Sequence, residues 1–358
     1  MDTIEIKGTR FPRFALLDAV TPIQRLARLE AELGERLNGV QLYAKRDDHV
    51  ALGGGGNKLR KLELHLGQAL AEGVDTLITV GGIQSNHARQ TAAAAALAGL
   101  RCELVLARMV PREGVDYERN GNVLLDELFG ATVHVAPAGT SALDQAQARA
   151  EELRRAGRKV LVIPSGGSTG LGALGYAACA AEIDAQAREL GIEFACVACP
   201  NGSAGTHAGL VAGFHALGRD PGLVRAYGVL APADEAAAMT VKLVDEACAL
   251  LGIAPPPAGT IGVEGAHRGE GYGIPTDGML AAVRLMARSQ GLLLDPVYSG
   301  KAFAGLLADI EAGRFRRGDK LLFLMTGGAP ALYAYRGIFE EARGQACAPA
   351  GLLQGRLH

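Results

Sequence analysis

Cysteine is scarce in this chain, and charge of one sign does not accumulate in it. The six cysteines among 358 residues have no spacing that resembles a disulfide framework, so an oxidised secreted scaffold is not expected. The formal net charge is −2, and lysine and arginine are scattered along the chain. This pattern indicates no positively charged patch that would bind nucleic acid or an anionic membrane.

Long hydrophobic runs are also lacking. The alanine-rich run after Gln90 is too short, and too closely flanked by arginines, to span a bilayer. The first twenty residues contain acidic and basic side chains and no apolar core, so a signal peptide is not expected. A lone CxxC motif, Cys196 and Cys199, lies inside the apolar run FACVAC and predicts a buried strand rather than a metal or redox site. We therefore expect a cytoplasmic protein without a bound metal.

Short apolar runs alternate with longer helical patterns, which is typical of open parallel α/β sheets covered by helices on both faces. The chain is longer than one hydrophobic core usually organises, so two domains are expected. Strands are predicted at residues 40–45, 76–80, 102–106, 132–135, 160–163, 194–198, 226–230 and 320–325. Helices are predicted at residues 59–72, 85–98, 122–129, 141–156, 173–190, 206–217, 233–251, 275–290 and 301–312.

Glycines concentrate at turns between predicted strands and helices. Four such turns also carry polar or ionisable residues, and they lie at residues 53–56, 81–82, 202–205 and 327–328. One such turn alone would indicate only a tight connection or a helix cap. Since ligands of open parallel sheets bind where strand carboxyl ends meet helix N-termini, the four together predict one shared crevice. The loop at residues 253–275 is rich in proline and glycine, is long enough to be functional, and supplies Tyr272 at the mouth of that crevice.

The segment at residues 200–209, PNGSAGTHAG, follows an apolar strand and opens an apolar helix. Small residues let several backbone N–H groups approach one anion, and the helix dipole favours the same charge. Ser203 and Thr206 add hydroxyl donors. The segment matches neither GxxxxGK[ST] nor GxGxxG, so it predicts a cup for a monophosphate rather than a nucleotide site.

Lys58 differs from the other lysines because four glycines and an asparagine precede it at the start of a predicted helix. The helix dipole there opposes an ammonium group and lowers its pKa. A lysine that is easily made neutral is a nucleophile toward aldehydes and forms a Schiff base with them. Lys61 follows one turn later on nearly the same face, where it either neutralises a phosphate or is simply solvated.

Six stretches in this order carry a resemblance to a known family: GGGGNKLRKLE, GGIQSNHARQTAAAAALAGL, GSAGTHAGL, GYGIPTDGM, LLDPVYSGKA and TGGAPALYAY. Together they resemble the 1-aminocyclopropane-1-carboxylate deaminase and D-cysteine desulfhydrase family, over about residues 10 to 335. L-cysteate sulfo-lyases are also similar. The resemblance implies the tryptophan-synthase-β type of pyridoxal-phosphate fold (fold type II) and suggests a homodimer. It also implies a large discontinuous domain of residues 1–53 and 165–358, with a smaller α/β domain of residues 54–164 inserted.

The resemblance further implies roles for individual residues. Lys58 would carry pyridoxal 5'-phosphate, and Asn86 would bond the phenolic oxygen of its ring. Ser85, Asn86 and His87 would meet the carboxylate of a small amino-acid substrate, while Tyr272 and Tyr298 would flank the reacting carbons. The remaining residues expected to contact the cofactor are Lys61, Gly202, Ser203, Ala204, Gly205, Thr206, Ser299 and Thr326.

The residue at position 299 distinguishes cyclopropane deamination from β-elimination. The deaminases of the family have a motif resembling VYEGK, in which a glutamate faces the pyridine nitrogen, whereas this chain reads VYSGK. A carboxylate stabilises a protonated ring and makes a stronger electron sink; a serine hydroxyl leaves the nitrogen neutral. Opening a cyclopropane needs the stronger sink, but expelling sulfide, sulfite or chloride does not. Ser299 therefore favours β-elimination, as in the desulfhydrases, although it could instead cap the following helix.

Several alternatives stay open. L-cysteate sulfo-lyase and 1-aminocyclopropane-1-carboxylate deaminase activities remain candidates, and the glycine pair at residues 81–82 looks more like the deaminase version. From other classes, a nucleotide-binding oxidoreductase would need an early GxGxxG turn, which the sequence lacks. A non-catalytic ligand-binding protein with the same fold would be expected to have lost Lys58 or the phosphate cup, and both are present.

Overall fold

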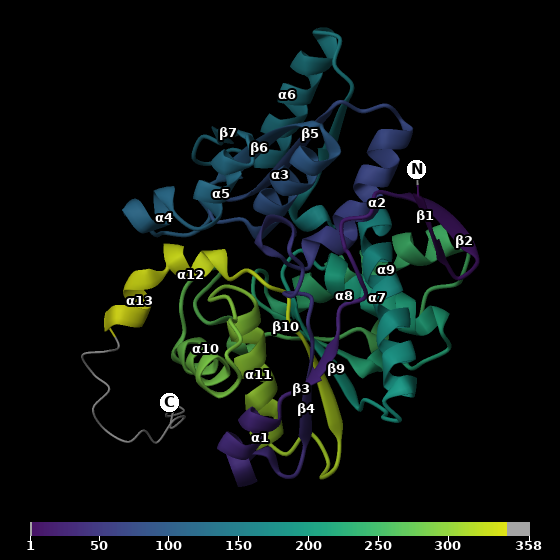
Figure 1. The fold of residues 1–358 in the computed structure, drawn as a ribbon, viewed down its shortest axis with the longest axis vertical. Helices are drawn as coiled ribbons and strands as arrows, with labels where there is room; N and C mark the ends of the chain where they lie inside the picture. Colours follow the sequence, from purple (N-terminus) through teal and green to yellow (C-terminus); the bar gives the residue numbers. More distant parts are fainter. Residues whose placement is uncertain (1, 342–358) are drawn as a thin grey trace.

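The computed structural model describes residues 2–341 and contains two parallel sheets stacked along the long axis of the molecule (Figure 1). The expected open α/β fold is confirmed. Each sheet is covered by helices on both faces, and α2 (Lys58–Ala71) lies where the two meet. No helix within residues 2–341 is long and apolar enough to cross a membrane.

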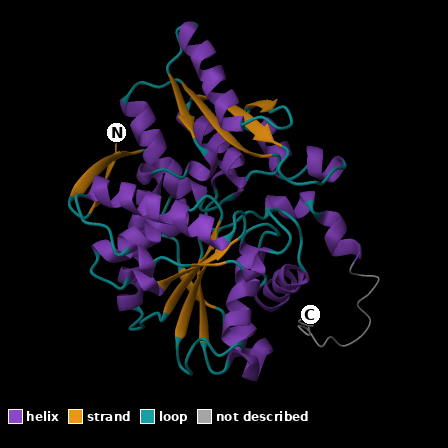
Figure 2. Ribbon diagram, turned by 180° about the vertical axis from the view of Figure 1, so that it is seen from behind, coloured by secondary structure: helices purple, strands orange, loops and turns teal. Residues whose placement is uncertain are grey.

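The larger sheet has six strands in the order β11-β10-β9-β12-β4-β3, and it is parallel except for β3, which pairs antiparallel with β4. Its strands fan out in the lower half of Figure 2. Their bounds, in sheet order, are Val263–Glu264, Val224–Gly228, Cys196–Asn201, Lys320–Leu324, Gln41–Lys45 and Ile23–Arg25. The smaller sheet is all parallel, in the order β7-β6-β5-β8. Its strands span Thr132–Val135, Arg101–Ala107, Thr76–Gly82 and Val160–Ile163.

The remaining elements complete the layers. A separate antiparallel hairpin pairs β1 (Asp2–Ile6) with β2 (Thr9–Arg13). The other α-helices, α1 and α3 to α13, span Ala27–Leu33, Asn86–Ala98, Val115–Arg119, Asn122–Leu128, Ala142–Arg155, Gly170–Glu189, Gly205–Ala216, Ala233–Leu251, Asp277–Gln290, Ser299–Glu311, Pro330–Ala334 and Arg336–Glu341. Short 3-10 helices, η1 to η6, span Gly34–Leu37, Leu52–Gly54, Ser165–Gly167, Pro221–Leu223, Ala258–Thr260 and Ala266–Arg268.

Strand alternation divides the core of the larger sheet between its two faces. In β9, Val197 and Cys199 face the layer of α7, α8 and α9, whereas Cys196 and Ala198 face the layer of α1, α10 and α11. All four side chains are buried. A strand covered on both sides must be apolar at every position, which explains the run FACVAC. The CxxC motif is thus part of a buried strand, as predicted.

Several predicted elements match the structure residue for residue, and others were missed. The predictions at 132–135, 160–163 and 233–251 coincide with β7, β8 and α9. The hairpin β1–β2 and the two-residue strand β11 inside the proline-rich loop were not predicted, because each depends on tertiary contacts rather than on its own periodicity. The strands of the smaller sheet all fall within residues 54–164. This arrangement supports the expected domain bounds, which stay a prediction.

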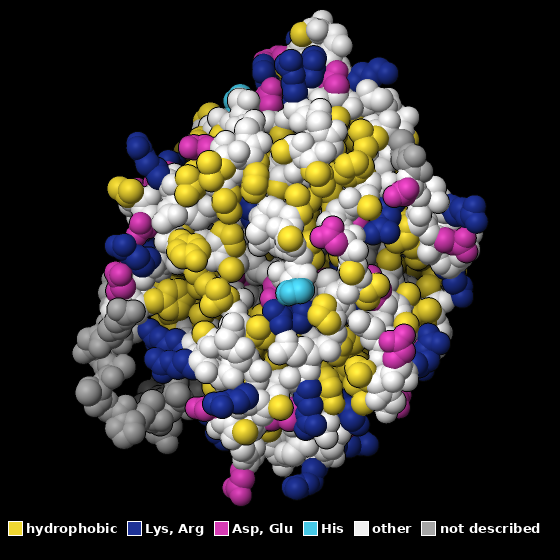
Figure 3. All heavy atoms as spheres, in the orientation of Figure 1, with side chains coloured by type: hydrophobic (Ala, Val, Ile, Leu, Met, Phe, Trp, Pro, Cys, Tyr) yellow, Lys and Arg dark blue, Asp and Glu magenta, His cyan; other side chains and the backbone are white. Residues whose placement is uncertain are grey.

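Charges of both signs intermix on the face shown in Figure 3, and neither lysine and arginine nor aspartate and glutamate forms a broad patch there. One ion pair, between Arg60 of α2 and Asp47, is instead buried. Arg60 donates to both carboxylate oxygens of Asp47 (2.8 and 2.9 Å) and to Glu182. Tyr176 also donates to Asp47 (2.6 Å). Through these bonds the helix that begins at Lys58 is tied to the larger sheet and to α7.

We predict that Asp47→Ala lowers the free energy of unfolding by roughly 3–5 kcal/mol, because it leaves a buried guanidinium short of its main partner. Burial alone would raise the pKa of Asp47, but Arg60 lowers it below its ordinary value of 3.8. This contribution to stability is therefore present above about pH 4 and is lost as the pH falls further. Chemical denaturation of the purified protein measures it. Glu5→Ala, which breaks the exposed Arg10–Glu5 pair, is the control and should change little; equal losses would contradict the assignment.

Candidate active site

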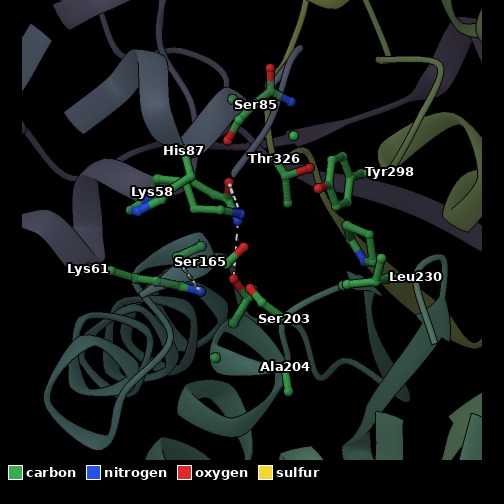
Figure 4. Close-up of a pocket in the computed structure, with 18 of the residues that line it drawn as sticks. Lys58, Lys61, Ser85, His87, Ser165, Ser203, Ala204, Leu230, Tyr298 and Thr326 are labelled. Atoms are coloured by element: carbon green, nitrogen blue, oxygen red, sulfur yellow. Dashed lines mark hydrogen bonds between the residues drawn. The ribbon is translucent and has the colours of Figure 1, made fainter. Parts of the chain in front are cut away.

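A pocket lies between the two sheets, at the carboxyl ends of their parallel strands. Gly82 ends β5, Pro200 lies near the end of β9, and Ser165, Leu230 and Thr326 follow β8, β10 and β12; all five line the pocket. Figure 4 shows Lys58 and Lys61 on one side of it, with Tyr298 and Leu230 across from them. Of the four glycine turns predicted to form one crevice, those at residues 81–82 and 202–205 line the pocket, whereas the other two are represented only by their neighbours Asn57 and Thr326.

Lys58 is the first residue of α2, and its amine faces the pocket. Its Nζ donates to Asn57 Oδ1 (3.2 Å) and lies 5.7 Å from the centre of the Tyr298 ring. Burial of the amine lowers the pKa of Lys58 to about 8, the Asp295 carboxylate opposes this shift, and the charge of Arg89 reinforces it. The direction matches the sequence argument, but burial rather than the helix dipole is the main cause.

Lys61 follows one turn later and is fully buried, so the solvated alternative is wrong. Its Nζ donates to Gly166 O and Ser168 Oγ, both at 3.2 Å. Burial, and then repulsion from Lys58, lowers the pKa of Lys61 well below its ordinary value. Two amines in one pocket, each destabilised as a cation, favour the binding of an anion between them.

The predicted phosphate cup has a shape that only small residues allow. Ala204 has a left-handed backbone (φ 65°) directly before α8, an uncommon conformation that occurs mostly where a site requires it. A Cβ at Gly205 would lie 2.6 Å from Ser168 Oγ and 2.9 Å from Lys61 Nζ. Ser203 Oγ bonds Ser168 Oγ (2.8 Å). The first N–H groups of α8 have no partner within the helix, so the cup offers several donors to one anion.

The N-terminus of α3 provides a second group of donors. Ser85 caps the helix by accepting from Ala88 N (3.1 Å), which leaves its own hydroxyl proton free. Asn86 and His87 are the first two residues of the helix, and their backbone N–H groups have no partner within it. Ser85, Asn86 and His87 all line the pocket, so a carboxylate could meet the helix start there.

The His87 ring is fixed in one tautomer. Thr79 donates its hydroxyl proton to Ile163 O (2.7 Å), so its oxygen must accept from His87 Nε2 (2.8 Å). Burial keeps the pKa of His87 well below its ordinary value, and the neutral ring then has no second N–H. A carboxylate in the pocket would therefore meet the His87 backbone rather than its imidazole.

Two tyrosines close the pocket on the side facing Lys58. The hydroxyl oxygens of Tyr272 and Tyr298 are 2.7 Å apart, and the rings meet edge to face. Burial raises the pKa of both phenols, so both carry their protons at neutral pH. One hydroxyl donates to the other, and the pair keeps one O–H free for a ligand.

The loop at residues 253–275 places Tyr272 by two backbone anchors. Lys301 Nζ donates to Gly271 O (2.9 Å) and Arg268 O (2.6 Å). Tyr335 donates to Gly273 O (2.9 Å) on the other side of the tyrosine. The expectation that this loop brings Tyr272 to the mouth of the crevice agrees with its position in the pocket lining.

Ser299 is buried at the start of α11 and is not among the residues that line the pocket. Its hydroxyl donates to Asp295 Oδ1 (2.6 Å) and accepts from Asp295 N (2.7 Å). The Asp295 carboxylate accepts from the backbone N–H groups that open the helix, so Asp295 rather than Ser299 caps it. The cofactor contact of Ser299 stays a prediction.

Sequence reasoning missed several pocket residues. Ser165, Gly166 and the adjacent Ser168 belong to a fifth glycine-rich turn, SGGS, between β8 and α7, and this pattern was available as a signal. Met109 and Leu230 belong to no recognisable motif, because they contribute only apolar surface to the pocket wall. Asn57 also lines the pocket and donates to Thr206 Oγ1 (3.1 Å).

Comparisons with known proteins agree with this geometry. Two parallel sheets with a lysine-lined pocket between their carboxyl ends define an α/β enzyme of fold type II. Residues 15–327 match the family model described as pyridoxal-phosphate dependent enzyme. The chain belongs to this family of pyridoxal-phosphate-dependent enzymes, and pyridoxal phosphate is its cofactor.

Individual relatives are similar over almost their whole length. D-cysteine desulfhydrase of Yersinia pestis (strain Pestoides F) is 43% identical over 333 residues, covering 93% of this chain and 98% of the relative. The protein of the same name from Serratia proteamaculans (strain 568) is 40% identical over 342 residues, covering 93% and 98%. A crystal structure of an ACC deaminase homologue aligns with a TM-score of 0.82 and 36% identity, covering 92% of this chain and 96% of that one. A pyridoxal 5'-phosphate-dependent aspartate racemase, at 15% identity, a TM-score of 0.61 and coverage of 87% and 90%, shares the fold.

Gly81 and Gly82 provide a matched pair of substitutions at the pocket wall. A Cβ at Gly81 would overlap the Ser85 side chain, whereas one at Gly82 would meet Met109 Sδ at 3.7 Å, an ordinary contact. We predict that Gly81→Ala displaces the start of α3 and raises KM for substrate at least tenfold, while Gly82→Ala folds normally and changes KM far less. Steady-state kinetics with thermal melting of both holoenzymes checks this. The reverse order would contradict the placement of α3.

Proposed function

We propose that this enzyme eliminates the β-substituent of D-cysteine and releases pyruvate, sulfide and ammonia. The observation that carries the proposal is that one pocket brings Lys58 together with the phosphate cup and the N-terminus of α3. The name D-cysteine desulfhydrase, shared by relatives at 40 to 43% identity, supports the choice of substrate. In the same proposal the protein is cytoplasmic and homodimeric.

The pocket residues fit pyridoxal phosphate. The cup formed by Gly202, Ser203, Ala204, Gly205 and Thr206 lines the pocket. A Cβ at 205 would press on Ser168 Oγ and Lys61 Nζ, so glycine there leaves both groups free to reach a phosphate. Lys61 Nζ lies at the same cup and would neutralise part of its charge. Lys58 would hold the cofactor covalently, Asn86 would donate to its phenolic oxygen, and Thr326 would contact its ring.

The substrate would be held by groups that donate hydrogen bonds. Its carboxylate would bind at the start of α3, to the Ser85 hydroxyl and to the backbone N–H groups of Asn86 and His87. Bound pyridoxal phosphate supplies the electron sink for the α-carbanion. The Lys58 amine, with a pKa of about 8, would be partly neutral near physiological pH and could take the α-proton of the substrate.

The tyrosine pair would act on the leaving group. Both phenols are protonated and line the pocket, and the Tyr298 ring lies beside Gly202 of the cup. The free O–H of the pair would donate a proton to the sulfur as the carbon–sulfur bond breaks. Lys58 Nζ lies 5.7 Å from the centre of the Tyr298 ring, so the amine and the phenols would face the same part of a bound substrate.

The walls of the pocket favour cysteine over the alternative substrates. Met109 and Leu230 are apolar, and Lys58 and Lys61 are the only lysines or arginines among its described lining residues. A sulfonate would need a further cation, which makes L-cysteate the weaker candidate. The deaminase alternative would need a carboxylate at the ring nitrogen, and position 299 is a serine whose proton is bonded to Asp295.

We predict release of pyruvate from D-cysteine with sulfide in equal amount, at a kcat/KM at least tenfold above that for L-cysteate or 1-aminocyclopropane-1-carboxylate. The physical reason is the apolar wall and the neutral residue at position 299. A coupled pyruvate assay over D- and L-cysteine, L-cysteate, β-chloroalanine and 1-aminocyclopropane-1-carboxylate measures this. Preference for L-cysteate or the cyclopropane would overturn the proposed substrate and leave the cofactor assignment standing.

We predict that Lys58→Ala abolishes turnover, whereas Lys61→Ala retains it with weaker cofactor binding. The first change removes the base and the covalent attachment. The second removes one charge-assisted contact to phosphate, which weakens binding by roughly 10- to 100-fold. Turnover assays and spectrophotometric cofactor titration separate the two effects. Residual turnover in Lys58→Ala with none in Lys61→Ala would reverse the assignment.

A further inference from the structure

Three polar side chains form a line of hydrogen bonds that ends at the pocket. Arg89 Nε donates to Asn122 Oδ1 (3.0 Å), and Asn122 Nδ2 donates to Asn86 Oδ1 (2.9 Å). Arg89 and Asn122 are fully buried, whereas Asn86 lines the pocket. Asn122, the first residue of α5, does not line the pocket itself. It acts on the pocket only through Asn86.

The direction of each hydrogen bond is fixed, because Asn122 also contacts one group that can only donate and one that can only accept. A guanidinium carries only donors, so Asn122 must turn its oxygen toward Arg89. The nitrogen of the same amide also donates to the backbone carbonyl of Gln84 (3.2 Å), which can only accept. Asn122 therefore presents an N–H to Asn86, and Asn86 must accept it with its oxygen. The Asn86 amide nitrogen is left for the pocket.

Gly328 gives that nitrogen its space. A Cβ at position 328 would lie 2.6 Å from Asn86 Nδ2, so any larger residue there would displace the amide. Within residues 2–341, this nitrogen donates to no protein acceptor, in contrast to the oxygen of the same amide. The arrangement thus offers one uncommitted donor at a defined place.

We propose that Asn122 and Arg89 are positioning residues, which hold the Asn86 amide so that its NH2 group faces the phenolic oxygen of bound pyridoxal phosphate. The inference rests on the proposed contact between Asn86 and that oxygen. A reversed amide has the same shape but would place its own oxygen against the anionic one. The correctly placed donor stabilises the negative oxygen and lowers the pKa of the proton that this oxygen shares with the Lys58 nitrogen.

Arg89 also holds the turn that precedes Lys58. Its Nη1 donates to the backbone carbonyls of Gly53 and Gly55, the latter at 2.8 Å. One buried guanidinium therefore fixes both the lysine and the amide that face the cofactor. Its side chain does not touch the pocket.

The test is the pH titration of the visible absorbance of the holoenzyme. Asn122→Asp has the same size and keeps the bond from Arg89, but it presents an acceptor to Asn86, whose amide then reverses. We expect the titration midpoint to rise by roughly one to two pH units, which corresponds to loss of one hydrogen bond to a charged group. The dissociation constant of the cofactor should rise about tenfold. Asn122→Ala, which leaves Asn86 unanchored, should give a smaller rise.

Asp126→Asn is the matched control on the same helix. Burial raises the pKa of Asp126 to about 8, so its carboxyl is mostly neutral at pH 7 and an amide replaces it closely. This variant should leave the midpoint unchanged.

A double-mutant cycle that combines Asn86→Ala with Asn122→Ala distinguishes a failed positioning role from a failed cofactor contact. The proposal is supported if Asn86→Ala raises the midpoint and Asn122→Ala adds nothing further in that background. If Asn86→Ala raises the midpoint but both Asn122 variants match the wild type, the positioning role is wrong and the proposed function stands. If Asn86→Ala has no effect, the proposed cofactor contact is wrong and the inference is overturned with it.

Discussion

The close approach of several backbone segments around Lys58 is the constraint on which the rest of the site depends. A Cβ at Gly327 would lie 2.8 Å from Gly56 Cα, and one at Gly328 would lie 2.6 Å from Asn86 Nδ2. Both glycines have positive φ angles, of 75° and 95°, which side chains rarely allow. The turn after β12 can therefore pack directly on the turn before α2, and the strand ends of both sheets reach a single pocket.

This closeness has an electrostatic consequence. Lys58 and Lys61 lie in the same pocket, their pKa values are lowered mainly by burial, and no aspartate or glutamate is among the described residues that line it. The lining residues therefore supply no negative charge to pair with the two lysines, and a bound phosphate would supply it. The same burial that disfavours an ammonium on Lys58 makes its amine available for covalent attachment and for proton transfer.

Much of the fold and part of the site could be predicted from the sequence. The alternation of short apolar or β-branched runs with longer helical patterns placed β7, β8 and the helix α9 at their observed bounds. Lys58 and the cup at residues 202–206 were found because local glycine patterns mark them. Asn122 and Arg89 could not be found in this way, since their role depends on which side chain each meets across the fold. The tautomer of His87 is set by Thr79 and Ile163 on two different strands, so it could not be predicted from the sequence either.

The central claim is that Lys58, and no other amine, carries the cofactor. Borohydride reduction of the holoenzyme fixes pyridoxal phosphate on the lysine that bears it, and peptide mapping by mass spectrometry then identifies that lysine. The account predicts one labelled peptide, which contains the glycine turn at residues 53–56 and is modified at Lys58. A label on Lys61 or on Lys301, the other buried lysine whose pKa is lowered to about 8, would contradict it.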